Sequence, residues 1–236
     1  AFVYFLAQQS DIVANGSEAQ AKTADDLMAL LTPIGKAFVT EVGFEAANLG
    51  VQVYGGHGFI REWGMEQIVR DARIAMLYEG TTGIQALDLL GRKVLGSGGK
   101  LLLGFTGMID AFCAAHTDAE YAEFVKPLQA HTQEWLSLSM KLGEAAMTNA
   151  DNAGGAAVDY LMYSGYVTLA YFWARMAVLA QQKIAEAHSE ESFYQAKVMT
   201  ARFYFERLLP RTESLKITML ADAKSLMDMP EALFQL

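Results

Sequence analysis

Residues 50–59 read GVQVYGGHGF and residues 77–85 read LYEGTTGIQ, and these two glycine-rich stretches interrupt a chain that is otherwise apolar at helical spacing. A helical protein tolerates such breaks where the backbone must turn sharply or come close to another group. The two stretches therefore predict two turns, about one short helix apart, at which the chain could approach a ligand.

Upstream of the first stretch, apolar residues recur at steps of three and four, which is typical of helices that bury one face. Asn15-Gly16-Ser17 predicts a helix end and a turn. Thr32 and Pro33 predict a second break, because threonine suits an N-cap and proline suits the first turn of the next helix. We expect helices over residues 1–15 and 18–31, and a third from Pro33 to the turn at Gly55.

The chain downstream of the first stretch also reads as helices separated by turns. Glu62-Trp63-Gly64 predicts a surface turn, and residues 65–73 predict a short helix of mixed charge. A new helix is expected to start at Thr81 or Thr82, where Thr82 and Gln85 fit the capping-box pattern. It should stop at Gly96-Ser97-Gly98-Gly99. Further helices are predicted over residues 100–115, 118–150, 155–187, 190–209 and 211–224, with turns at 152–155 and 188–189.

The composition favours an all-α protein with large buried helix faces. Hydrophobic residues make up 53% of the 236 residues, the mean hydropathy is +0.16, and only four prolines occur. The Gly/Ser segment at 96–99 marks the clearest boundary, because long uninterrupted helices follow it. We predict an up-and-down helical bundle over residues 1–96, followed by a second helical bundle that extends it over residues 97–236.

Charge and cysteine content exclude several classes of protein. The formal net charge is −9 and there is no basic run, so no nucleic-acid partner is expected. Cys113 is the only cysteine; it excludes an internal disulfide and fits a reducing, cytoplasmic compartment. His116 and His131 show no cysteine or acid partner at ligand spacing, so we expect no metal site.

Two apolar segments raise the question of membrane targeting. Residues 156–180 are interrupted by Asp159, Ser164 and Arg175 and lack a flanking positive cluster, so we expect a buried bundle helix and no membrane span. The first residues, AFVYFL, lack the basic region and cleavage site of a signal peptide. We expect them to lie inside a longer protein.

Glu79 is the sharpest candidate for chemistry. It follows the apolar residues 74–77 and precedes Gly80 at a helix start. Apolar burial and a helix N-terminus act on a carboxylate in opposite directions, which makes its proton affinity tunable for a base that removes a weakly acidic carbon-bound proton. The alternative is an acid that only complements the helix dipole.

The other candidates also have two readings. The hydroxyl and amide groups of Thr81, Thr82 and Gln85 could bind phosphate or the polar edge of a ring, or could serve only as helix caps. Gly55-Gly56-His57-Gly58 could cradle a pyrophosphate with backbone N–H groups, although no strand precedes it. A plain helix end with a tight turn is the alternative there.

Three motifs, taken in order and spacing, resemble the C-terminal helical domain of the acyl-CoA dehydrogenases. They are QVYGGHGF at residues 52–59, RDARI at 70–74 and YEGTTGIQ at 78–85. The resemblance covers roughly residues 1–95. Residues 97–236, with DLLGRK at 88–93, resemble more weakly the extra helical region of the larger bacterial-type branch, which includes broad-range acyl-CoA and 3-methylthiopropanoyl-CoA dehydrogenases.

The resemblance implies an FAD-dependent oxidoreductase of fatty-acid β-oxidation. In that family a glutamate at the position of Glu79 removes the α-proton of an acyl-CoA thioester, and the β-hydrogen leaves as hydride to flavin N5, giving a trans-2-enoyl-CoA. Many members carry a second glutamine where Gly83 stands. The resemblance assigns Glu79 as the catalytic base, Tyr78 and Gly80 to the substrate, Thr81 to the flavin of the same subunit, and Gln52, Gly55 and Gly56 to the FAD of a neighbouring subunit.

The resemblance also implies partners. These are a homodimer or homotetramer and electron-transfer flavoprotein or a similar acceptor. The family's N-terminal helical domain and middle β-domain are absent from the sequence, so we expect the fragment alone to be inactive. The alternative is a non-catalytic helical module for assembly or binding; a DNA-associated flavoprotein relative is disfavoured by the net charge of −9.

Overall fold

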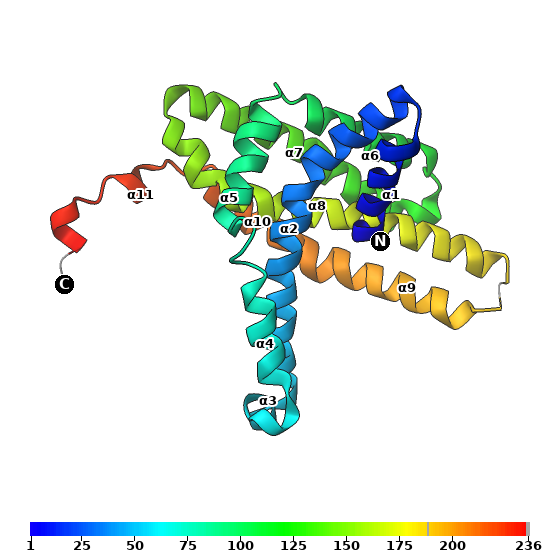
Figure 1. Ribbon diagram of the computed structural model, residues 1–236. Coiled ribbons are helices and arrows are strands. Elements are labelled where there is room, and N and C mark those ends of the chain that lie inside the picture. The colour runs from blue at the N-terminus through cyan, green and yellow to red at the C-terminus, as the bar shows by residue number, and fades with distance from the viewer. Residues whose placement is uncertain (188, 235–236) are drawn as a thin grey trace.

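The computed structural model describes residues 1–187 and 189–234, and the regular structure in that part of the chain is helical, as predicted (Figure 1). In chain order the elements are α1 (Phe2–Asn15), α2 (Glu18–Tyr54), α3 (Gly56–Phe59), η1 (Arg61–Trp63), α4 (Met65–Ile74), α5 (Thr82–Leu87), η2 (Asp88–Leu95), α6 (Lys100–Ala115), η3 (Ala119–Tyr121), α7 (Ala122–Thr148), α8 (Ala150–Ala185), α9 (Glu191–Phe203), η4 (Tyr204–Leu208), η5 (Leu209–Arg211), α10 (Thr212–Met219), α11 (Lys224–Met227) and η6 (Glu231–Phe234).

α2 is a single helix that passes through Pro33, so the predicted break at Thr32 and Pro33 is wrong. The helix begins with a capping box between Ser17 and Gln20, which confirms the turn predicted before it. A proline inside a helix lacks one hydrogen-bond donor and crowds the preceding turn, which costs about 3 kcal/mol. Pro33 is buried beside Ile34, and packing of this face in the bundle offsets that cost.

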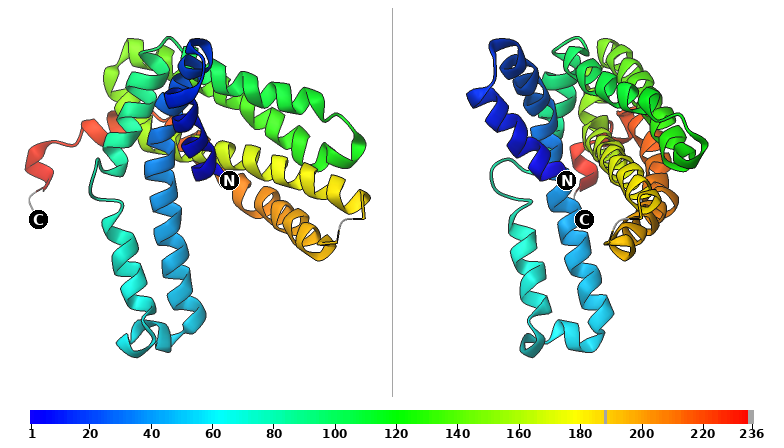
Figure 2. Two further views of the ribbon diagram at one scale, coloured as in Figure 1. Left: turned by 45° about the vertical axis from the view of Figure 1, so that its right-hand side comes forward. Right: turned by 90° about the vertical axis from the view of Figure 1, so that its right-hand side faces the viewer.

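The C-terminal part of α2 leaves the bundle and forms a projecting helical arm with α3 and α4 (Figures 1 and 2). We define the helical arm as residues 45–74. Its helices approach closely because Gly50 has no side chain: a Cβ there would lie 2.6 Å from Met65 Cε. At the end of α2, Gly55 has a φ of 60° and a ψ of −143°, which favours glycine. The turn and the short helix predicted here are confirmed.

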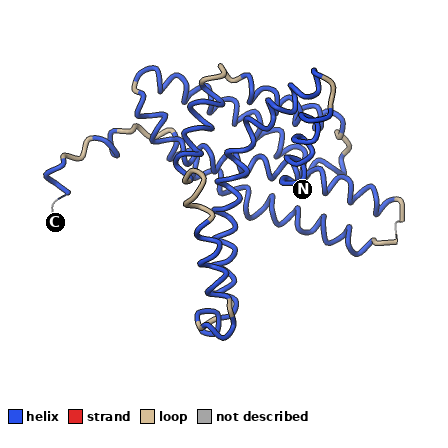
Figure 3. The backbone as a smooth tube through the Cα atoms, viewed as in Figure 1, coloured by secondary structure: helices blue, strands red, loops and turns tan. Residues whose placement is uncertain are grey.

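The rest of the chain forms a bundle around α8, which contacts α2, α5, α7, α9 and α10. One continuous hydrophobic core runs from Phe2 to Met219 and takes residues from both sides of position 96. The two predicted bundles therefore share a core, and the domain boundary at 96/97 stays a prediction. Figure 3 shows that short loops join most of the helices.

The start of α8 differs from the prediction. The helix begins at Ala150 and is capped by the side chain of Asn149, so the turn predicted at 152–155 is wrong. Asn152 lies inside the helix, and its Oδ1 accepts a hydrogen bond from the Ala223 N–H at 2.9 Å. A polar residue that suggested a turn thus ties α8 to the C-terminal segment.

Other helix ends agree more closely. α6 matches the predicted range, whereas α7 starts at Ala122, after a 3₁₀ turn, and α10 ends at Met219, short of the predicted residue 224. His188, predicted to lie in a turn, is outside the described residues.

The apolar segment 156–180 lies within α8 and is mostly buried in the bundle. Among the described residues, α2 is long and apolar enough to cross a membrane. The pair Thr82–Leu95 and Lys100–Ala115 would pass only as one span, although it is bent by 87°. These tests rest on length and composition, which core helices also satisfy.

Candidate functional site

The segment between α4 and α5 places Glu79 on a sharply turned loop, residues 75–81, which we call the Glu79 loop. Glu79 has a φ of 56° and Gly80 a φ of 89°. For a residue with a Cβ the left-handed conformation costs about 1–3 kcal/mol, so surrounding contacts must hold it. The Glu79 side chain is exposed to solvent.

Two side chains hold the backbone of the Glu79 loop. Gln85 Nε2, from α5, donates to the Glu79 carbonyl oxygen at 3.0 Å. Lys36 Nζ, from α2, donates to the Gly80 carbonyl oxygen at 2.6 Å. A Cβ on Gly80 would lie 2.8 Å from Gln85 Nε2, so only glycine leaves room for this arrangement. The loop is therefore fixed from both neighbouring helices.

The start of α5 is tied to α2 as well. Thr81 is the N-cap and its side chain makes no capping bond. Thr82 Oγ1 donates to Glu41 Oε1 at 2.5 Å, and the side-chain amide of Gln85 donates to the Glu79 carbonyl oxygen. The capping box predicted for Thr82 and Gln85 is therefore not formed, because both side chains make longer-range contacts.

Around the carboxylate, the Glu79 loop and the first turn of α5 present apolar groups to solvent, and other side chains anchor the loop. Tyr78 and Ile84 are 51% and 59% exposed. Met76 is buried, and Arg73 donates to its Sδ at 3.4 Å while its guanidinium lies 5.6 Å from the Phe44 ring centroid. An exposed carboxylate flanked by apolar surface on a fixed loop suits a base that acts on a partly apolar substrate.

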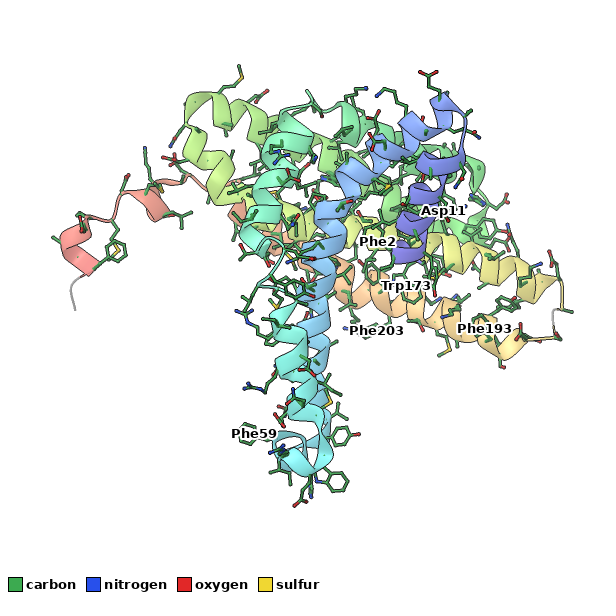
Figure 4. All side chains as sticks on the ribbon, in the orientation of Figure 1. Phe2, Asp11, Phe59, Trp173, Phe193 and Phe203 are labelled. Carbon is green, nitrogen blue, oxygen red and sulfur yellow. The ribbon has the colours of Figure 1, made fainter. Side chains whose placement is uncertain are left out.

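Three predicted cofactor residues lie elsewhere. Gln52, Gly55 and Gly56 are exposed at the end of the helical arm, where Figure 4 labels Phe59. The ten residues of α4 separate them from Glu79, a helix length of about 15 Å. A Cβ on either glycine would meet nothing within 4 Å. This open carboxamide and glycine surface fits contact with one part of FAD, but it does not enclose the cofactor.

The turn at the end of the arm also has a structural role. A Cβ on Gly58 would lie 2.5 Å from the Val51 carbonyl oxygen, so the chain passes too close for any side chain. The His57 ring packs edge-on against Trp63, with centroids 5.5 Å apart. Gly58 and His57 therefore shape the turn that presents Gln52 and Gly55.

One polar cluster is missed by the sequence analysis. Ligand atoms of His131, Glu134 and Glu213 lie within 4.8 Å of one another, so the expectation that His131 has no acid partner is wrong. The spacing of three between His131 and Glu134 on one helix was the available signal. Lys216 Nζ lies 2.7 Å from Glu134 Oε1 and 2.8 Å from Glu213 Oε2. The ammonium compensates the carboxylates, and the cluster is an ion-pair network that joins α7 to α10.

Cys113 is a core residue. Its side chain is buried, and burial followed by the charge of Asp110 raises the pKa of the thiol to about 11. The thiol therefore stays protonated near neutral pH and is a poor nucleophile.

Comparison with known proteins adds two family matches. Residues 12–95 match the family described as acyl-CoA dehydrogenase, C-terminal domain, and residues 105–230 match the one described as acetyl-CoA dehydrogenase C-terminal like.

Three relatives illustrate the similarity. The 3-methylmercaptopropionyl-CoA dehydrogenase of Ruegeria pomeroyi is 35% identical over 206 residues, 84% of this chain and 34% of that protein. A butyryl-CoA dehydrogenase of Syntrophomonas wolfei is 31% identical over 98% of this chain and 38% of that protein. The broad-specificity linear acyl-CoA dehydrogenase of Mycobacterium tuberculosis is 29% identical over 91% of this chain and 36% of that protein. The chain therefore spans between 34% and 38% of the length of these relatives.

Proposed function

Because the chain belongs to the acyl-CoA dehydrogenase family, we propose that it forms the C-terminal part of an FAD-dependent acyl-CoA dehydrogenase with Glu79 as the catalytic base. The observation that carries the proposal is the Glu79 loop, where an exposed carboxylate is held in a left-handed turn by hydrogen bonds from two helices. Strained backbone maintained by its surroundings is found preferentially at functional sites.

The reaction removes two hydrogens from the acyl group. The Glu79 carboxylate takes the α-proton, and a carbon–carbon double bond forms as the β-hydrogen leaves with its electron pair, giving a trans-2-enoyl-CoA. FAD, when bound, supplies the acceptor for that hydride. The backbone N–H of Glu79 polarises the thioester carbonyl, where negative charge develops. Tyr78 and Gly80 border the acyl-CoA, and Thr81 contacts the flavin of the same subunit.

The arm supplies the second part of the proposal. Gln52, Gly55 and Gly56 contact the FAD of a neighbouring subunit, which makes a homodimer or homotetramer part of the site. They lie about 15 Å of helix from Glu79 along α4, so they would contact a different part of a bound cofactor from the part beside Glu79. The assignment to the FAD of a neighbouring subunit rests on the family resemblance. The proposal includes an electron-transfer flavoprotein or similar acceptor and a cytoplasmic location.

The acyl group is left open. The relatives are named for a methylmercaptopropionyl, a butyryl and a broad range of linear acyl-CoA thioesters. The residues described here do not enclose an acyl chain at Glu79.

The test uses the full-length parent protein. Glu79→Gln should leave FAD bound yet lower kcat by several orders of magnitude, since the base is lost while binding groups remain. Glu62→Gln, an exposed acid in the turn of the arm, is the matched control and should turn over normally. Near-normal turnover of the Glu79→Gln enzyme would refute the assignment.

A second function, a non-catalytic assembly module, is favoured by the exposed apolar residues of the arm, among them Val53 at 85% and Phe59 at 79%. The parent chain discriminates between the two. If the chain is an assembly module, the Glu79→Gln variant should bind its partner as tightly as the wild type does. The parent protein should then show no acyl-CoA-dependent reduction of an artificial acceptor.

A further inference from the structure

We propose that Lys36 is a positioning residue for Glu79, acting through the carbonyl group of Gly80. The inference rests on the proposed function, because it gives Lys36 a role only if Glu79 carries the chemistry. It concerns a residue on α2 that is separated from Gly80 by 44 positions and that lies outside the three motifs of the sequence.

The partner of Lys36 is unusual for a lysine of this chain. Four other lysines pair with carboxylates, namely Lys22, Lys100, Lys183 and Lys216. Within residues 1–187 and 189–234 no carboxylate pairs with Lys36, and its ammonium donates to the Gly80 carbonyl at 2.6 Å in a half-buried setting. A charged donor at this distance makes one of the stronger classes of hydrogen bond.

Lys36 projects from a part of α2 whose neighbouring residues are buried. The neighbouring residues Ala37 and Phe38 are 0% and 1% exposed, and the ring of Phe38 lies directly against Gly165 of α8. The Lys36 ammonium is therefore attached to the shared core and not to the projecting arm. A rigid anchor is what a positioning group needs in order to hold a loop within a fraction of an ångström.

The bond acts on the peptide group that follows Gly80, one peptide group further along the chain than the one that follows Glu79. Gln85 holds the Glu79 carbonyl from α5 and Lys36 holds the Gly80 carbonyl from α2, so two consecutive peptide groups are fixed from opposite helices. Without Lys36 the left-handed conformation of Glu79 loses one of these two restraints, and the loop relaxes towards commoner backbone geometry. A shift of about 1 Å in a reacting group lowers the rate by about 100-fold.

The experiment measures the full-length parent protein with Lys36→Met, Lys36→Arg and the matched control Lys22→Met, a lysine of the same helix whose side chain is 68% exposed. Turnover with butyryl-CoA and an artificial acceptor gives kcat and KM, flavin absorbance gives the bound FAD, and hydrogen exchange of peptides spanning residues 75–82 reports the loop. Lys36→Met should keep its FAD and its KM but lose about 10- to 100-fold in kcat. Exchange in residues 75–82 should become about 10-fold faster or more, and nowhere else. Lys36→Arg should keep most of the wild-type kcat and most of the wild-type protection from exchange in residues 75–82.

A fourth comparison separates positioning from folding. On a Glu79→Gln background, Lys36→Met should cause no further loss of rate, because the group that Lys36 positions is already gone. The inference is overturned if Lys36→Met behaves like Lys22→Met or if exchange rises across the whole chain. It is also overturned if Lys36→Met lowers the rate by the same factor in the Glu79→Gln enzyme as in the wild type. Near-normal turnover of Glu79→Gln alone would instead refute the proposed function, and that result is distinguishable from all three.

Discussion

Gly165 of α8 lies directly against the ring of Phe38 of α2. A Cβ built on Gly165 would come within 2.2 Å of Phe38 Cγ and Cδ2, a separation that atoms not bonded to each other do not adopt. The contact joins α8 to the helix that carries Lys36 and Glu41. Packing of α8 therefore helps to fix where α2 lies relative to the Glu79 loop.

Replacing Gly165 should destabilise the shared core. Gly165→Ala forces Phe38 or α8 to move and should lower the free energy of unfolding by about 1–3 kcal/mol, the usual cost of overpacking. Gly154→Ala, on the same helix with nothing within 4 Å of its Cβ, should be neutral or slightly stabilising. Denaturant unfolding of both variants checks the prediction, and equal stability would contradict it.

The turn at the end of the arm gives a second matched pair. Gly58→Ala places a Cβ 2.5 Å from the Val51 carbonyl and 2.8 Å from Val51 Cα, so it should destabilise the turn by about 1–3 kcal/mol. Gly56→Ala meets nothing within 4 Å and should leave stability unchanged. Hydrogen exchange of residues 50–60 measures the difference. Similar exchange in the two variants would show that the close approach is not required.

Stability at acid pH should depend on Glu134. Burial alone would raise the pKa of this carboxyl, but hydrogen bonds from Lys216 and Tyr163 outweigh burial and hold the pKa below its usual value. The folded state therefore binds fewer protons than the unfolded state, and the stabilisation is present above the unfolded-state pKa and lost as pH falls through the folded-state pKa. We expect a loss of about 1 kcal/mol, because the side chain is 34% exposed.

Chemical denaturation between neutral and acid pH tests this expectation. Glu134→Gln should be less stable than the wild type near neutral pH and should lose less stability on acidification. Glu144→Gln, an exposed acid on the same helix, should follow the wild-type pH profile. The interpretation fails if the Glu134 variant and the Glu144 variant have the same profile.

The isolated chain should not retain flavin. Glu79 and Thr81 are exposed, and Gln52, Gly55 and Gly56 form an open surface, so the described residues offer contacts without an enclosing pocket. The purified fragment should lack stoichiometric FAD by absorbance and should not oxidise butyryl-CoA. A yellow fragment with one FAD per chain would contradict the prediction.

Local sequence signals predicted the fold where local chemistry decides it. The turns at Gly16 and Gly55 follow from glycine and capping preferences, and both are confirmed. The break predicted at Pro33 is wrong because the burial of a whole helix face outweighs a local penalty of about 3 kcal/mol. The turn predicted at Asn152 is wrong because this side chain bonds Ala223, which is 71 residues away in the sequence.

The candidate site shows the same division. Glu79 and Gly80 carry a sequence pattern, whereas Lys36 meets the Glu79 loop, and Glu41 meets Thr82, only after α2 and α5 have packed. Glu134 and Glu213 likewise come together from different helices across the bundle. No periodicity or motif reports such contacts, because they depend on how helices cross.

The continuity of α2 has a mechanical consequence. One rod of 37 residues, about 55 Å long, starts in the bundle, passes under the Glu79 loop and ends at the Gly55 turn. Most of the buried residues of this helix lie between Ala24 and Phe38, before the helix leaves the bundle. The direction in which the arm projects is therefore set by how this buried stretch packs. A change in packing at the contact between Phe38 and Gly165 would shift the position of the arm tip without altering a residue of the arm.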